Sequence, residues 1–174
     1  MDSVITIMRE ASASLVEKRS EFIGYAAPVA NEEEATEFVK KIKKKHADAR
    51  HNVFAYVLNG GAQKRYSDDG EPQGSAGMPV LEVLVKNKLD GVVAVVTRYF
   101  GGILLGTGGL VRSYTAAAKA ALENAGIEYN EELYDIYSDF GALEKYRLMT
   151  DEEFKVFAYW RKYDKENGTR KAYD

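Results

Sequence analysis

Five glycines and two arginines gather in the stretch TRYFGGILLGTGGLVRSY, residues 97–114, and this stretch is the part of the sequence best suited to binding an anion. Glycine lets a backbone approach a ligand closely, and a helix that starts after a glycine pair presents free N–H groups. Arginine binds phosphate or carboxylate through two parallel hydrogen bonds. The alternative is architectural: the same glycines let a buried strand turn tightly into a packed helix. The candidate ligand-binding residues are Arg98, Gly101, Gly102, Gly106, Gly108, Gly109, Leu110 and Arg112.

Known phosphate motifs do not fit this loop. The spacing from Gly101 to Thr107 is that of a nucleotide-binding P-loop, but the lysine before the hydroxyl residue is missing. In the run from Gly106 to Val111, valine stands where the dinucleotide fingerprint requires its third glycine. An anion would instead rest on the Gly108–Leu110 amides, and we expect no cofactor.

An acidic cluster, Asp68, Asp69 and Glu71, surrounds Gly70 in a second irregular stretch. One interpretation is a turn-forming pair whose carboxylates cap neighbouring backbone groups. The other is a general base or metal ligand, in which case the loops at residues 66–79 and 98–112 would form one cleft. The spacing is not that of a calcium loop, and with no cysteine in the chain we predict no metal site.

Histidine occurs twice, at His46 and His51, without the helical spacing of a zinc pair. His51, at the start of a predicted strand, is either a hydrogen-bonded polar residue or a proton carrier, and we favour the first. No serine has the context of a catalytic nucleophile, so no catalytic residue is assigned.

The one basic run is KKIKKKHADAR, on the outer face of a predicted helix. A solvated helix face explains it, and contact with RNA or a ribosome is the alternative. The lysines concerned are Lys40, Lys41, Lys43, Lys44 and Lys45.

Composition indicates a globular protein of 174 residues with 45% hydrophobic residues and a net charge of −3. The negative charge argues against a broad electrostatic grip on nucleic acid. We expect no signal peptide and no membrane span, and the absence of cysteine suits the cytoplasm.

Hydrophobic periodicity predicts an α+β domain with the order ββαββαβα. The capping pair Asn31 and Glu34 opens one helix, and the β-branched run VVAVVT is typical of a strand buried on both faces. Residues 79–88 are ambiguous, but Pro79 favours a helix. The predicted strands are 4–8, 20–29, 52–58, 63–67 and 92–97, and the predicted helices are 32–45, 79–88 and 110–126.

Three long motifs in order, HADARHNVFAY, RYSDDGEPQGSAGMPVL and TRYFGGILLGTGGLVRSY, resemble the YigZ/IMPACT family over residues 14–128. The resemblance implies a ribosomal protein S5 domain 2-like fold, a two-layer sandwich with a mixed or antiparallel sheet and two helices on one face. It also implies that Leu104 stands where the family usually carries lysine, which removes one cation beside the loop. Eukaryotic members of the family are linked to translational control.

We therefore expect a domain at residues 1–128 and a short appendage at 129–174, too short for the ferredoxin-like second domain of bacterial relatives. The first functional hypothesis is a non-enzymatic binding protein acting in translation through RNA, a ribosome or a protein partner. The second is an enzyme for a small anionic or phosphorylated substrate, with the acidic loop as base or metal ligand. The third is self-association through apolar residues of the appendage, namely Phe154, Phe157 and Trp160. The oligomeric state stays open.

Overall fold

Alternating strands and helices follow each other through residues 5–129, which are the residues that this computed structural model describes. Residues 130–174, which make up nearly all of the expected appendage, lie outside them, as do its apolar residues Phe154, Phe157 and Trp160. The strands are β1 (Ile5–Ile7), β2 (Ala11–Glu17), β3 (Ser20–Pro28), β4 (His51–Leu58), β5 (Gln63–Ser67), β6 (Val92–Tyr99) and β7 (Ile127–Tyr129). The helices are α1 (Glu32–Lys45), α2 (Gly77–Lys86) and α3 (Gly106–Ala125).

Five strands form one antiparallel sheet in the order β2-β3-β6-β4-β5. The central strand β6 is buried from Val92 to Arg98, as its β-branched sequence predicts. Strands β1 and β7 pair separately. The sheet therefore has two edges, β2 and β5.

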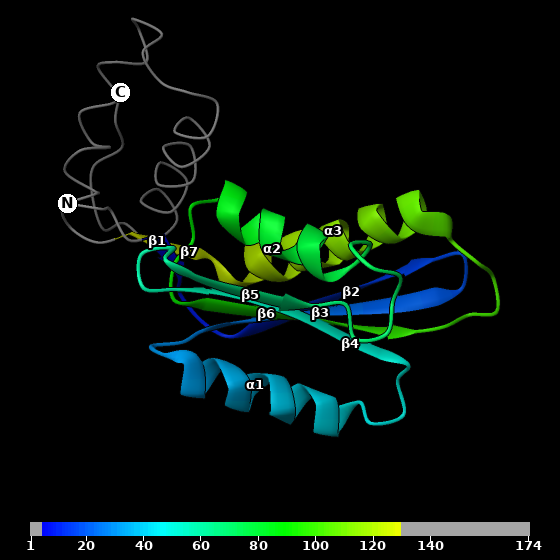
Figure 1. The fold of residues 1–174 in the computed structure, drawn as a ribbon, viewed down its shortest axis with the longest axis horizontal. Helices are drawn as coiled ribbons and strands as arrows, with labels where there is room; N and C mark the ends of the chain where they lie inside the picture. The colour runs from blue at the N-terminus through cyan, green and yellow to red at the C-terminus, as the bar shows by residue number, and fades with distance from the viewer. Residues whose placement is uncertain (1–4, 130–174) are drawn as a thin grey trace, which may run out of the picture. The chain divides into compact units, whose positions relative to one another are not determined.

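Helices cover both faces of the sheet, with α2 and α3 on one face and α1 on the other (Figure 1). The expected two-layer sandwich is therefore wrong, because α1 adds a third layer. An apolar stripe on α1, which includes Phe38 and Ile42, packs with Tyr25 of β3 and Val95 of β6. A strand buried on both faces requires such cover on each side.

The start of α1 follows the predicted cap. The side chain of Asn31 accepts a hydrogen bond from the Glu34 backbone at 2.9 Å, and the Glu34 carboxylate accepts one from the Ala30 backbone at 2.7 Å. The first bond satisfies a donor that the first helical turn leaves free, and the second ties the residue before the cap to that turn. None of the helices within residues 5–129 combines the length and apolar character needed to cross a membrane.

Helix α3 lies unusually close to the sheet at Gly24 of β3. A Cβ atom at this position would overlap the backbone carbonyl of Ala117. Nearer the start of α3, the Tyr114 ring meets the Phe22 ring edge-on, with centroids 5.2 Å apart. These contacts fix the direction of α3, and so they fix where its first turn lies.

Strand β2 was not predicted. Its sequence, ASASLVE, alternates partly exposed and exposed positions, but alanine and serine fill most of both sets, so no hydrophobic period results. The two-residue turn Lys18-Arg19, with φ values of 44° and 65°, joins it to β3 in a tight hairpin.

Candidate functional site

The two loops that the sequence analysis singled out border one hollow with a volume of about 410 Å³, which we call the inter-loop cleft. Polar side chains form its floor, apolar side chains form most of its walls, and the first turn of α3 closes one end. Its lining residues are Arg50, His51, Gly70, Glu71, Pro72, Arg98, Phe100, Leu104, Leu105, Gly106, Thr107 and Leu110. Loops far apart in the sequence therefore share one concave surface.

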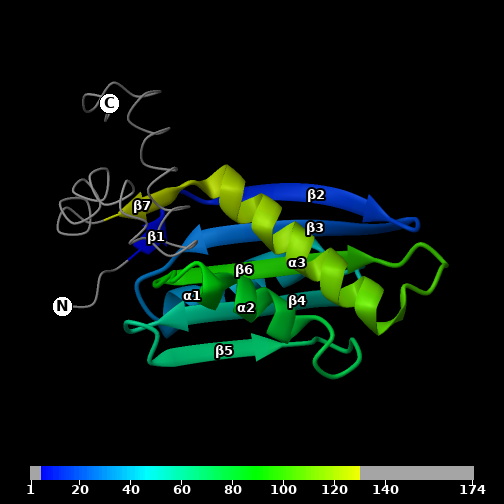
Figure 2. The same ribbon diagram turned by 90° about the horizontal axis from the view of Figure 1, so that it is seen from above.

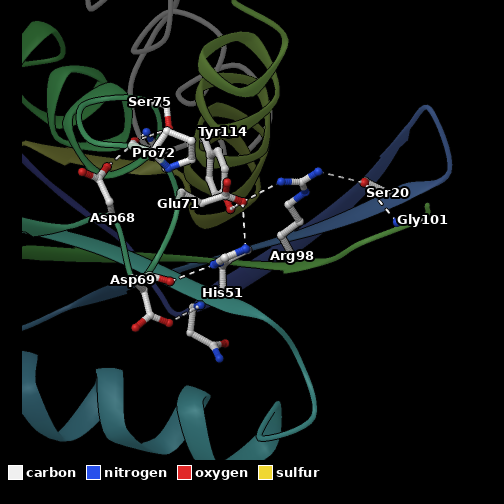
Figure 3. A network of polar contacts seen from close by, with 12 residues as sticks. Ser20, His51, Asp68, Asp69, Glu71, Pro72, Ser75, Arg98, Gly101 and Tyr114 are labelled. Carbon is white, nitrogen blue, oxygen red and sulfur yellow. Dashed lines mark hydrogen bonds and ion pairs between the residues drawn. The ribbon is translucent and has the colours of Figure 1, made fainter. Parts of the chain in front are cut away.

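One carboxylate oxygen holds the floor of this cleft together (Figure 3). Oε1 of Glu71 accepts hydrogen bonds from Nη1 of Arg98 at 2.7 Å and from the Tyr114 hydroxyl at 2.9 Å. Nε2 of His51 lies 3.5 Å from the same oxygen. Burial, and next to it the carboxylate, raises the pKa of Tyr114, so its hydroxyl keeps its proton and donates. We call these four residues the Glu71 cluster.

The hydrogen bond on the far side of His51 determines which ring nitrogen carries hydrogen. Nδ1 lies 2.8 Å from the backbone carbonyl of Asp69, which only accepts, so Nδ1 donates. Nε2 is then a lone pair facing Glu71 in the neutral ring and a second donor in the imidazolium. His51 is a hydrogen-bonded polar residue. A proton added at its Nε2 would lie between the imidazole ring and the Glu71 carboxylate.

Arg98 is buried, and its guanidinium contacts other side chains of the protein rather than open space. Its guanidinium carbon lies 5.6 Å from the Phe22 ring centre and 5.5 Å from that of Phe100. Nη2 donates to the Ser20 hydroxyl at 3.3 Å, which also accepts from the Gly101 backbone. Nε is buried without a hydrogen-bond partner. Its charge is balanced by Glu71, so Arg98 holds the loop and floor in place.

The three carboxylates of the acidic cluster point in different directions. Asp68 accepts hydrogen bonds from the backbone N–H groups of Gly74, Ala76 and Gly77, and so it organises the loop and the start of α2. Asp69 accepts from the backbone of Asn52 at 2.7 Å. Only Glu71 faces the cleft. Within residues 5–129 no three His, Cys, Asp or Glu side chains converge on a common metal position.

Helix α3 begins at Gly106, four residues earlier than predicted, and its cap residue Leu105 supplies no side-chain hydrogen bond. The N–H groups left free by helical geometry are therefore those of Gly106, Thr107 and Gly108. Gly109 and Leu110, two of the candidate residues, direct their N–H groups to carbonyls within the helix. The expected set of amides, at residues 108–110, is thus shifted back by two residues.

The other glycines of the stretch serve the backbone. At Gly101 a Cβ atom would overlap the carbonyl of Arg19 in the β2–β3 turn. Gly102 and Gly106 have φ values of 88° and 71°, which residues other than glycine disfavour. Part of the glycine pattern is thus architectural, and it brings the α3 start to the cleft.

Comparison with known proteins agrees with the motifs. Residues 18–122 match the family described as the Impact N-terminal domain. This chain belongs to the IMPACT family. It is 46% identical over 129 residues to the IMPACT family member YvyE of Bacillus subtilis, covering 73% of this chain and 59% of that protein. It is 44% identical over 108 residues to YigZ of Escherichia coli, covering 60% of this chain and 53% of that protein.

A solved structure described as that of a hypothetical protein is also similar. Its TM-score is 0.70 at 38% identity, and the likeness covers 75% of this chain and 65% of that one. This chain spans little more than half the length of YvyE and YigZ.

Arg112, the second predicted arginine, does not line the inter-loop cleft of this IMPACT domain. It borders a separate hollow of about 400 Å³ between β2 and α3, together with Gly109. Leu104 is 83% exposed at the edge of the inter-loop cleft. Of the predicted binding residues, Arg98, Gly106 and Leu110 line the inter-loop cleft, and Gly109 and Arg112 line the second hollow. The other three, Gly101, Gly102 and Gly108, line neither hollow.

Most lysines of the basic run on α1 contact a side chain of the IMPACT domain. Lys40 pairs with Glu37, Lys41 with Glu10 and Lys43 with Asp69, while Lys45 lies over the Tyr25 ring. Only Lys44 of the five has no such contact in the described residues. The nucleic-acid contact predicted for this run stays a prediction.

A second polar network lies beside α1, around His46. The Tyr25 hydroxyl lies 2.6 Å from Nε2, and Nδ1 lies 2.6 Å from the Tyr99 hydroxyl, which itself donates to Asp48 at 2.9 Å. Because Tyr99 gives its hydrogen to Asp48, Nδ1 donates and Nε2 accepts, so the neutral ring is fully satisfied. Burial, and next to it the Lys45 charge, lowers the pKa of His46.

The side chains of the site that were not predicted individually include Arg50, Phe100, Thr107 and Tyr114. Arg50 precedes His51, and its guanidinium carbon lies 5.3 Å from the Phe100 ring centre at the cleft. Tyr114 sits in the quoted glycine stretch, and its helical spacing from Leu110 was the available signal. No local pattern marks its bond to Glu71, which is 43 residues away.

Proposed function

We propose that this IMPACT chain is a non-enzymatic, cytoplasmic binding protein connected with translation or its regulation. The inter-loop cleft recognises an acidic group on a protein partner, with carboxylate or phosphate oxygens on the amides of Gly106, Thr107 and Gly108. The family's link to translational control supports a role in translation or its regulation. The sheet and the α2–α3 pair on one face support the inference of an S5 domain 2-like fold.

The observation that carries this proposal is the uncapped start of α3 at one end of a hollow with apolar walls. Free amides and the positive end of the helix dipole favour an anion there, and exposed Arg50 adds charge at the cleft. Phe100, Leu104 and Leu105 suit the apolar flank of a protein ligand better than a sugar-phosphate chain. The Glu71 carboxylate is already occupied by Arg98 and Tyr114, which suits recognition rather than base catalysis.

Ribosome binding tests the proposal in its broader form. We expect the chain to co-sediment with ribosomes at low salt and Arg50→Glu to bind at least about fivefold more weakly, since one favourable charge becomes unfavourable. Lys64→Glu, on the exposed part of β5, makes the same change in net charge away from the cleft. Equal loss in both variants, or no binding by the wild type, would contradict the proposal.

Salt and nuclease identify the kind of partner. Contacts to RNA phosphates release counterions, so RNA-mediated binding falls steeply between 50 and 200 mM salt and is lost after nuclease treatment. Binding to a ribosome-associated protein survives nuclease and weakens less. Nuclease-sensitive binding would transfer the role to the lysines of α1, with Lys44→Glu as the test variant.

The second candidate function is an enzyme acting on a small anionic or phosphorylated substrate. One observation favours it: His51 lines the cleft with its Nδ1 fixed and its Nε2 beside Glu71. A thermal-shift screen with nucleotides, phosphosugars and Mg²⁺ tests it, since a ligand at 100-fold its dissociation constant stabilises by about 2.7 kcal/mol. A flat result removes this candidate.

A further inference from the structure

The outer edge of β2 has backbone groups without partners. In the hairpin, the closing pair Glu17 and Ser20 is hydrogen-bonded, so the odd-numbered residues of β2 bond to β3 and the even-numbered ones point outward. The Ser12 carbonyl accepts a hydrogen bond from the Asn124 side chain at 2.9 Å. Among the described residues, no strand pairs with this edge at Ser14 and Val16.

The two edges of the sheet are protected differently. The other edge strand, β5, carries Lys64 and Arg65, and charged side chains of this kind discourage pairing with another chain. Strand β2 has seven residues, no proline, and a charge only at its last position, Glu17. Val16 beside it is 69% exposed. The β2 edge therefore has the features of a surface that accepts a further strand.

A groove runs beside this edge. Helix α3 crosses the sheet obliquely. The C-terminal end of α3 lies over β2, and the helix lies farther from β2 toward the N-terminal end of α3 (Figure 2). The separation leaves the hollow of about 400 Å³, which we call the β2–α3 groove. Leu15 and Leu105 give it apolar walls, and Ala116 leaves room along the helix. An added strand would direct every second side chain toward this groove.

The charges of the groove select what enters it. Arg112 and Lys18 both line it, and neither forms an ion pair among the described residues. Glu17 is its one carboxylate within that part of the chain. Two cations beside apolar walls match an acidic side chain carried on a short hydrocarbon stem.

We propose that an extended acidic segment of a partner protein adds to β2 as a sixth strand. Its backbone pairs with the N–H and C=O groups of Ser14 and Val16, and one glutamate or aspartate enters the β2–α3 groove opposite Arg112. Main-chain bonds supply affinity, and the groove supplies the preference for alternate acidic residues. This surface is separate from the inter-loop cleft and does not depend on the function proposed for that cleft.

A peptide titration tests this surface. The probe is a blocked seven-residue peptide of alternating valine and glutamate, and its control has lysine in place of glutamate. We expect saturable shifts of the Ser14 and Val16 amide resonances and about tenfold weaker binding of the lysine peptide. Equal binding of the two peptides, or no shift at these amides at millimolar concentration, would overturn the proposal.

Matched variants separate this surface from the cleft. Arg112→Glu should weaken binding of the glutamate peptide about tenfold. Arg50→Glu makes the same charge change in the cleft and should leave binding of this peptide unchanged. Ser14→Pro removes an outward N–H that β3 does not use, so it should fold and lose the peptide. The proposal is wrong if Arg50→Glu is as damaging as Arg112→Glu. It is also wrong if the amide resonances of β2 shift with protein concentration in the absence of peptide, since a second copy of the chain then occupies this edge.

Discussion

Replacing Glu71 with methionine removes the anion of the Glu71 cluster and leaves the Arg98 guanidinium buried without its counterion. The two side chains are 3% and 6% exposed, so water does not replace the lost partner. Breaking a buried pair in this way costs about 3–5 kcal/mol, and Arg98→Met should cost a similar amount by stranding the carboxylate. If the sites were independent, the double variant would lose about 6–10 kcal/mol.

The double variant should lose far less. With both charges gone, the remaining costs are the Tyr114 hydroxyl left without its acceptor, about 1–3 kcal/mol, and the hydrogen bond from Arg98 to Ser20, which the Arg98→Met single variant loses as well. Two methionines fill a similar volume. We therefore expect a coupling free energy of at least about 2 kcal/mol, measured by urea unfolding of the wild type and the three variants. The matched control is the exposed pair Glu82 and Lys86, 3.9 Å apart, whose cycle should give at most about 1 kcal/mol.

Additivity within about 0.5 kcal/mol at Glu71 and Arg98 would refute this account, since it would mean that the pair gains nothing from mutual neutralisation. A single variant that fails to fold while the double variant folds would support it without numerical analysis.

Three further predictions concern the loop, the second polar network and the edge of the cleft. Gly101→Ala should destabilise the domain by about 2–4 kcal/mol in urea unfolding, because its Cβ overlaps the Arg19 carbonyl, whereas Gly102→Ala, which meets open space, should cost about 1–2 kcal/mol. Equal effects would contradict this geometry. Because burial lowers the pKa of His46, the unfolded chain binds its proton more readily. The wild type should then lose stability as the pH falls below about 6.5, and His46→Gln should show a flatter profile from pH 7.5 to 5. Leu104→Lys should strengthen phosphate binding about two- to fivefold in an amide titration and leave the unfolding free energy unchanged, since the side chain is 83% exposed; a shift of the unfolding midpoint would argue against a free loop position.

Most of the fold follows from local patterns. The capping pair Asn31 and Glu34, the β-branched run of β6 and the alanine-rich α3 each fix an element through interactions within a few residues. Strand β2 could not be found this way, because its alanines and serines carry no hydrophobic period and it is stabilised by pairing with β3. The third layer was predictable in principle, since a strand buried on both faces needs cover on each side.

The site was predictable as a pair of loops but not as a set of atoms. The turn signal of Asp68, Asp69 and Gly70 is local, and Asp68 does bind backbone groups of its own loop, whereas Asp69 binds the backbone of Asn52 on β4. The inward direction of Glu71 depends on Arg98 and Tyr114, which meet it only after the sheet and α3 have packed. Side-chain direction after a turn with positive φ values is a property of the tertiary structure.

The close contact between Gly24 and Ala117 has a consequence for how tightly a ligand is held. At 1.5 Å per residue, this contact lies about 16 Å along α3 from the amides of its first turn. A methyl group on residue 24 would lift the helix from the sheet, and the rigid helix would carry that displacement to its far end. If the inter-loop cleft binds a ligand as proposed, its affinity would depend in part on Gly24, which does not line it, and substitutions there would change affinity while leaving the residues that line the cleft unaltered.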